Sequence, residues 1–127
     1  MQKYKLRNAG LVILGILILA ACTSKTIVVP TIIPPAKEYK FSTDVLPLFT
    51  QHCATTGCHS TGNIPPDLSA ANAYNNLFSD NLVNKVNPEQ SVIYTVVAAG
   101  GSMNSHLPNS TDQLTILYWI QQGAKNN

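Results

Sequence analysis

The stretch Cys53-Ala54-Thr55-Thr56-Gly57-Cys58-His59 decides how the rest of this chain is interpreted. It contains two thiols with four residues between them, and an imidazole directly follows the second thiol. Thiolates and imidazoles bind metals, and neighbouring thiols also form disulfides or attach a cofactor covalently. The stretch alone therefore leaves three chemistries open: a disulfide, a zinc site and a haem group held through both thiols.

The first 21 residues have the organisation of a bacterial export signal. Three basic residues among the first seven precede an unbroken run of apolar or small residues from Leu11 to Ala21. A run of about 11 residues is too short to cross roughly 30 Å of hydrocarbon, but it fits the core of a signal peptide. The leader ends Leu19-Ala20-Ala21-Cys22, which resembles the lipobox of bacterial lipoproteins. That resemblance implies cleavage before Cys22 and lipidation of Cys22; the alternative is an ordinary signal peptide that ends near a cysteine.

Export and lipidation limit what the remaining cysteines can do. We expect the mature protein to be anchored by lipid to a membrane, without spanning it, and to face the periplasm. Thr23 rather than an aspartate follows Cys22, which favours the outer membrane. Lipidation uses Cys22, so Cys53 and Cys58 are the only remaining pair, and free thiols are not expected to persist outside the cytoplasm.

Charge excludes a nucleic-acid partner. Three of the eight basic residues of the chain lie in the leader, which leaves five lysines against six carboxylates after processing. The basic patch that phosphate binding requires is therefore absent.

The 127 residues leave room for one small domain after the leader. Residues 22–40 are expected to form an extended tether, because they contain Pro30, Pro34 and Pro35 and have no helical periodicity. The apolar pieces within residues 27–33 could instead lie along the domain surface or pair as a short strand. We expect the folded domain to comprise residues 41–127, with its first contacts near Tyr39.

Four short helices are expected in this domain. The first covers Phe41 to Phe49, capped by Thr43 or Asp44 with Pro47 in its first turn, and presents Val45, Leu48 and Phe49 on one face. The second opens at Leu68 and Ser69, runs through Asn76 and carries an apolar stripe formed by Tyr74, Leu77 and Phe78.

The third helix is expected within Val92 to Val97, after the start signal Asn87-Pro88-Glu89-Gln90-Ser91. Residues 98–108 should form a loop. The last helix should span Thr111 to Gln122, with Ser110 and Gln113 as a capping box and Gly123 as its end. This all-α domain of short helices and long loops has a thin core, which a buried, flat, apolar cofactor would fill.

The order of these motifs resembles a known family. Phe41-x-x-Asp44-Val45-Leu46-Pro47-Leu48-Phe49 leads into Cys-x4-Cys-His, followed by Pro88-Glu89-x-Ser91-x-x-Tyr94, a loop with a methionine and Trp119-Ile120-x-x-Gly123-Ala124. This pattern is similar to the small class I-type cytochrome c domains of exported bacterial proteins. The resemblance implies an all-α, cytochrome c-like fold around one haem c, attached through Cys53 and Cys58, with His59 as the proximal iron ligand. The gap between the cysteines is four residues here instead of the usual two, and Gly57 could permit the required turn.

The resemblance also implies a methionine from the late loop as the distal iron ligand. Met103 is the only methionine besides Met1. His106 is the competing ligand, and an open distal side is the third possibility. A ligating imidazole usually donates its other N–H to a carbonyl, and we expect the Ile64-Pro65-Pro66 loop, centred on Pro65, to supply that carbonyl. His52, next to Cys53, is expected to be a surface residue.

The function implied is that of a membrane-anchored monohaem cytochrome, which passes single electrons between redox partner proteins of the cell envelope and is not an enzyme. One alternative is a five-coordinate haem sensor or weak peroxidase, which would require that Met103 does not bind iron. The other is a structural lipoprotein, held by a Cys53–Cys58 disulfide or by zinc bound to Cys53, Cys58, His59 and either His52 or His106.

Overall fold

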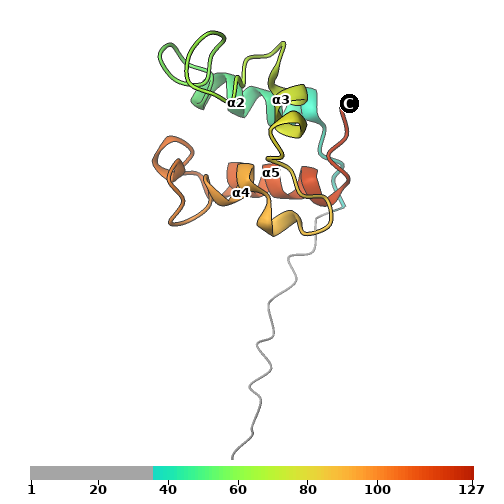
Figure 1. The fold of residues 1–127 in the computed structure, drawn as a ribbon. Coiled ribbons are helices and arrows are strands. Elements are labelled where there is room, and N and C mark those ends of the chain that lie inside the picture. Colours follow the sequence, from blue (N-terminus) through green and yellow to red (C-terminus); the bar gives the residue numbers. More distant parts are fainter. Residues whose placement is uncertain (1–35) are drawn as a thin grey trace, which may run out of the picture. The chain divides into compact units, whose positions relative to one another are not determined.

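The structure, a computed structural model, describes residues 36–127 (Figure 1). The expected signal peptide of residues 1–21, the expected lipidation of Cys22 and most of the expected 22–40 tether therefore lie outside the described residues. Every regular element within 36–127 is helical and none is a strand, which confirms the all-α class for this part of the chain. No helix formed by these residues is both long and apolar enough to span a membrane.

The first helix is continuous but begins as a π-helical turn. The turn η1 covers Phe41–Val45, and the α-helix α2 follows directly over Leu46–His52. Pro47 has no N–H for the carbonyl four residues earlier and its ring crowds that carbonyl, which favours the wider turn before it. The expected cap at Thr43 or Asp44 is wrong, because Lys40 is the N-cap. The Asp44 carboxylate instead reaches back and accepts a hydrogen bond from the Lys40 backbone N–H at 2.9 Å.

The second helix starts later than expected. Helix α3 covers Ala73–Ser79, and residues 69–72 form a turn before it instead of its first residues. Asp67 favours that turn, because its carboxylate accepts the Ser69 N–H at 2.9 Å and so competes with a helical start. The expected apolar stripe is confirmed: Leu77 is fully buried, and Tyr74 and Phe78 pack against the core.

One short α-helix and two 3₁₀ turns follow. The 3₁₀ turn η2 covers Pro88–Gln90, α4 covers Val92–Thr95, and a second 3₁₀ turn η3 covers Asn104–His106 within the loop of residues 98–108. The β-branched run expected to be helical over residues 92–97 is helical over residues 92–95, and residues 96 and 97 form a turn after it. Ser91, which is 1% exposed, stabilises its start: the Ser91 hydroxyl accepts the Asn84 N–H at 2.9 Å.

The last helix, α5, covers Ser110–Gln121. The expected capping box of Ser110 and Gln113 is wrong, because Asn109 is the N-cap and its side chain accepts the Thr111 N–H at 2.9 Å. Gln113 is buried, and its amide donates to the Leu107 carbonyl at 2.7 Å. Gly123 has φ +99°, a conformation that glycine adopts without strain, and it ends the helix as expected.

The core lies where η1, α2 and α3 meet α4 and α5, which form two groups in Figure 1. The ring of Phe41 is its centre, with ring centroids 5.2 Å from Tyr74 and 5.4 Å from Trp119. The chain end closes over the same place, since the Asn127 carbonyl accepts the Ser42 N–H at 2.9 Å. The other fully buried large side chains belong to Val45, Phe49, Leu77, Leu107, Ile116, Leu117 and Ile120.

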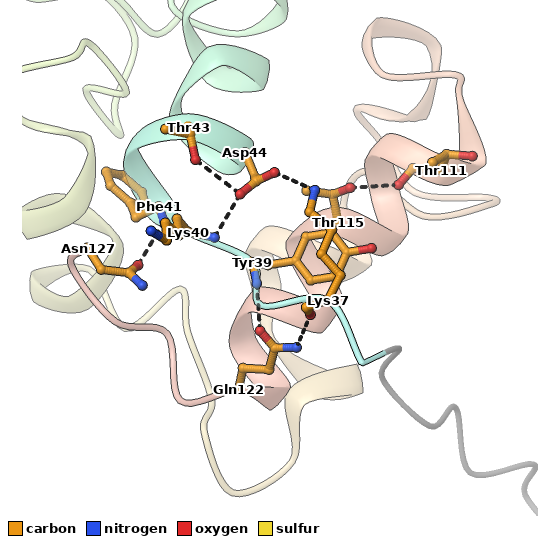
Figure 2. Close-up of polar contacts among 10 residues, drawn as sticks. All are labelled: Lys37, Tyr39, Lys40, Phe41, Thr43, Asp44, Thr111, Thr115, Gln122 and Asn127. Atoms are coloured by element: carbon orange, nitrogen blue, oxygen red, sulfur yellow. Dashed lines mark hydrogen bonds and ion pairs between the residues drawn. The ribbon is translucent and has the colours of Figure 1, made fainter.

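Residues 37–40 pack against the end of α5 and form hydrogen bonds with it (Figure 2). The Gln122 side chain accepts the Tyr39 N–H and donates to the Lys37 carbonyl, both at 2.8 Å. The Tyr39 ring lies 5.5 Å from the ring of Tyr118. The Lys37 ammonium lies 2.6 Å from the Asp44 carboxylate, and this hydrogen bond and that from Lys40 lower the pKa of Asp44. The boundary expected at residue 41 is therefore too late: the folded unit already includes Lys37.

Candidate functional site

A cavity of about 400 Å³ lies between the helices, within the size range of small-molecule and cofactor pockets. Loop 53–68 and loop 98–108 extend from the same end of the molecule in Figure 1 and both contribute to it. Its polar and sulfur-containing lining consists of His52, Cys53, Cys58, His59, Ser102, Met103 and His106. The remaining lining is apolar: Ile64, Pro66, Leu68, Leu82, Val92, Ile93, Val96 and Val97.

The two cysteines reach the cavity because helix α2 leads directly into the turn that carries them. Cys53 is the C-cap of α2, and its N–H donates to the Phe49 carbonyl at 2.8 Å. Two further backbone hydrogen bonds fold the four-residue segment between the cysteines into a turn. The Cys58 N–H donates to the Thr55 carbonyl and the His59 N–H donates to the Cys53 carbonyl, both at 3.0 Å. Gly57 has φ +83°, the left-handed conformation expected of it.

Both thiols are free in this structure. Burial raises the pKa of the Cys53 thiol, and the neighbouring Cys58 raises it further. Each thiol lies in the cavity wall beside the other without being joined to it.

The His59 ring is oriented by two carbonyl groups. Its Nδ1 lies 3.1 Å from the carbonyl oxygen of Ile64 and 3.1 Å from that of Pro66. Carbonyl oxygens only accept, so Nδ1 must donate to them, and in the neutral ring Nε2 then carries the lone pair with which it can ligate a metal. The expected Ile64-Pro65-Pro66 loop therefore supplies the acceptors, but the choice of Pro65 within it is wrong: the residues on either side of Pro65 do so.

Asp67 holds this carbonyl loop against α3. Its carboxylate accepts the Ser69 N–H at 2.9 Å and the Asn72 amide at 2.8 Å, and its carbonyl accepts the Asn76 amide at 2.9 Å. The hydroxyl and backbone N–H of Ser69, followed by the other donors, lower the pKa of Asp67 to about 2. The loop is further tied to the histidine by the Leu68 N–H, which donates to the His59 carbonyl at 2.7 Å.

Met103 and His106 both line the cavity from the late loop. Met103 is 38% exposed, and its N–H donates to the Val96 carbonyl at 2.7 Å. His106 is the last residue of η3 and is also exposed. His52 is exposed, as expected, and also contributes to the cavity wall.

The zinc alternative is not supported by the donor geometry. Within residues 36–127, no three His, Cys, Asp or Glu side chains come together closely enough to hold a metal ion. A second hollow of about 390 Å³ lies between Ala36, Tyr39 and Trp119, but it is lined by no thiol, imidazole or thioether.

Sequence reasoning missed the aliphatic wall of the cavity. Val92, Ile93, Val96 and Val97 were identified as a helix, but nothing in the pattern distinguished core packing from a cavity wall. The available signal was that Ile93, Val96 and Val97 follow Val92 by one, four and five positions, which places all four on one face of a helix.

Comparison with protein families, curated proteins and solved structures found no match for this chain. The class of protein defined by the fold and site is thus a helical domain whose apolar cavity is lined by two thiols, an oriented imidazole and a thioether.

Proposed function

We propose that this protein is a membrane-anchored monohaem c-type cytochrome that carries single electrons between partner proteins of the cell envelope. One observation carries the proposal: Cys53, Cys58, His59 and Met103 line the same largely apolar cavity, although Met103 is 44 or more residues away from the others in sequence. These are the donors that a covalently attached haem with one imidazole and one thioether ligand requires.

The residues present fit that group. The cavity is lined by eight apolar side chains, which suit a flat aromatic macrocycle and exclude water. Two thiols at its wall can each form a thioether. The His59 ring presents Nε2 because Nδ1 is held by the Ile64 and Pro66 carbonyls, and hydrogen bonds of this kind from a metal-binding imidazole also raise its basicity as a ligand.

The haem iron would supply reversible one-electron oxidation and reduction. The chain would supply the rest: Cys53 and Cys58 would fix the cofactor covalently, and His59 and Met103 would both ligate its iron. With both of these side chains bound, no iron position would be left for a substrate. That arrangement suits electron carriage and not catalysis.

The cavity wall also bears on the partners. No lysine, arginine or carboxylate among residues 36–127 lines the cavity. Docking at this opening would therefore depend little on ionic steering, and we propose redox partners whose contact surface is correspondingly apolar. Lipidation at Cys22 would keep the protein at the membrane surface, facing the periplasm.

The decisive experiment is a pyridine-haemochrome spectrum of protein purified from cells that mature c-type cytochromes. We expect covalently bound haem in the unaltered chain, and the band position reports whether one or two thioethers form across the four-residue gap. Cys53→Ala and Cys58→Ala should each remove one thioether, and the double variant should hold no covalent haem. Cys22→Ser is the matched control, since it should abolish lipidation and keep the haem. An unaltered protein without covalent haem would refute the proposal.

The ligand assignment is tested separately. Met103→Ala should remove the long-wavelength methionine–iron absorption band, whereas His106→Ala should retain it. Persistence of the band in Met103→Ala would contradict the assignment. The five-coordinate sensor would instead be supported if ferrous protein with intact Met103 bound carbon monoxide rapidly.

A further inference from the structure

The loop that carries Met103 is fastened to the carboxyl end of α4. The Met103 N–H donates to the Val96 carbonyl at 2.7 Å. The Asn104 side-chain amide donates to the Val97 carbonyl at 2.9 Å. Val96 and Val97 themselves line the cavity, so both hydrogen bonds tie the loop directly to the cavity wall.

Gly101 makes this close approach possible. A Cβ atom at this position would overlap the carbonyl oxygens of Thr95 and Val96. Because these are backbone atoms, they cannot move aside as the end of a flexible side chain would. Gly101 also accepts the Asn104 N–H at 3.2 Å, which connects the two contacts. Neighbouring Gly100 differs: it has φ +81° but open space around it.

The other end of the loop is held as well. Leu107 is 1% exposed, and its carbonyl accepts the buried Gln113 amide at 2.7 Å. Between these two points, Met103 is the N-cap of the 3₁₀ turn η3 and His106 is its last residue, and both line the cavity. The same short segment therefore offers the cavity both a thioether and an imidazole.

We infer that Gly101 and Asn104 are positioning residues that select Met103 over His106 as the distal iron ligand. This inference rests on the proposed function. The fastening acts on the backbone of Met103 itself, through its N–H and through the residue on its carboxyl side. It thus holds the thioether against the cavity, while the His106 N–H donates to the Met103 carbonyl at 3.0 Å and not to α4. Loss of the fastening releases Met103 first.

Two variants test the inference, each with a matched control. Asn104→Ala removes the hydrogen bond from the Asn104 side chain to the Val97 carbonyl. Ser105→Ala is its control, because it alters the neighbouring, exposed residue of the same turn. Gly101→Ala introduces the overlap with the α4 backbone. Gly100→Ala adds a methyl group to the same loop without an overlap, and so controls for a change of backbone strain alone, since Gly100 has φ +81°. In Asn104→Ala we expect an about two- to tenfold larger fraction of molecules without the methionine–iron band, the range that one lost hydrogen bond produces. Gly101→Ala should lose the band almost completely.

Two further readouts separate ligand selection from general stability. Bis-histidine ligation lowers the reduction potential, so Gly101→Ala should have a lower potential than Gly100→Ala, and Gly101→Ala combined with His106→Ala should bind carbon monoxide instead. Hydrogen exchange of the Met103 amide should be about two- to tenfold faster in Asn104→Ala than in Ser105→Ala, a readout that does not depend on the haem.

The haemochrome spectrum of each variant distinguishes the two failures. If the unaltered protein has no covalent haem, the proposed function fails and the inference fails with it. If all variants hold haem and both Gly101→Ala and Asn104→Ala keep the full methionine–iron band, the inference alone is overturned.

Discussion

Replacement of Gln122 by alanine tests whether the segment before the first helix belongs to the folded unit. Gln122 makes two hydrogen bonds of 2.8 Å to this segment, one to the Tyr39 N–H and one to the Lys37 carbonyl. At about 0.5–1.5 kcal/mol each, their loss should lower the free energy of unfolding by about 1–3 kcal/mol. Thr115→Ala is the control on the same helix, since its hydroxyl bonds only within α5, to the Thr111 carbonyl at 3.0 Å (Figure 2).

The assay is urea unfolding followed by the fluorescence of Trp119, the single tryptophan, which is 1% exposed and donates to the Lys125 carbonyl at 2.9 Å. Trypsin cleavage after Lys37 and Lys40 gives a local readout, because an undocked segment is cut faster. Lys37→Ala should have a smaller effect than Gln122→Ala, since the Lys37–Asp44 ion pair is exposed to solvent. The reasoning is refuted if Gln122→Ala unfolds within about 0.5 kcal/mol of the unaltered protein and is cleaved at the same rate.

Three further predictions concern stability. The pKa of Asp67, about 2, lies below its ordinary value of 3.8, so the stabilising contribution of its carboxylate should be present above pH 4 and lost as the pH falls towards 2. Asp67→Asn should therefore flatten this part of a plot of urea midpoint against pH. An unchanged slope would contradict the prediction. Asn109→Ala should lower the free energy of unfolding in urea by about 1 kcal/mol, because the Asn109 side chain caps α5. An equal loss in Ser110→Ala would contradict this and would support Ser110 as the capping residue. Leu77→Ala, at a fully buried site, should cost about 2–5 kcal/mol in the same assay; a loss under 1 kcal/mol would mean that the site collapses or is already loosely packed.

Helix positions were predictable where periodicity is strong, and helix starts were not. Leu77 and Phe49 are buried as their spacing indicates, because one face of an amphipathic helix must be covered. In the last helix Leu117 is buried, but Leu114 and Tyr118, which share its spacing, are only partly buried. The starts at Lys40 and Asn109 were misjudged, because several neighbouring polar residues can each cap a helix. Which one does so depends on where the preceding chain comes from, and that is set by tertiary contacts.

The candidate site divides in the same way. The sequence by itself determined the local chemistry: two thiols and an imidazole within seven residues, a glycine that permits the turn between them and a carbonyl-rich loop shortly after them. Only the tertiary structure decided that Ile64 and Pro66, not Pro65, hold His59, and that Met103 and His106 enter the same cavity. The reason is physical: turn chemistry acts over a few residues, whereas the approach of residues 101–104 to α4 depends on backbone contacts that no local pattern encodes.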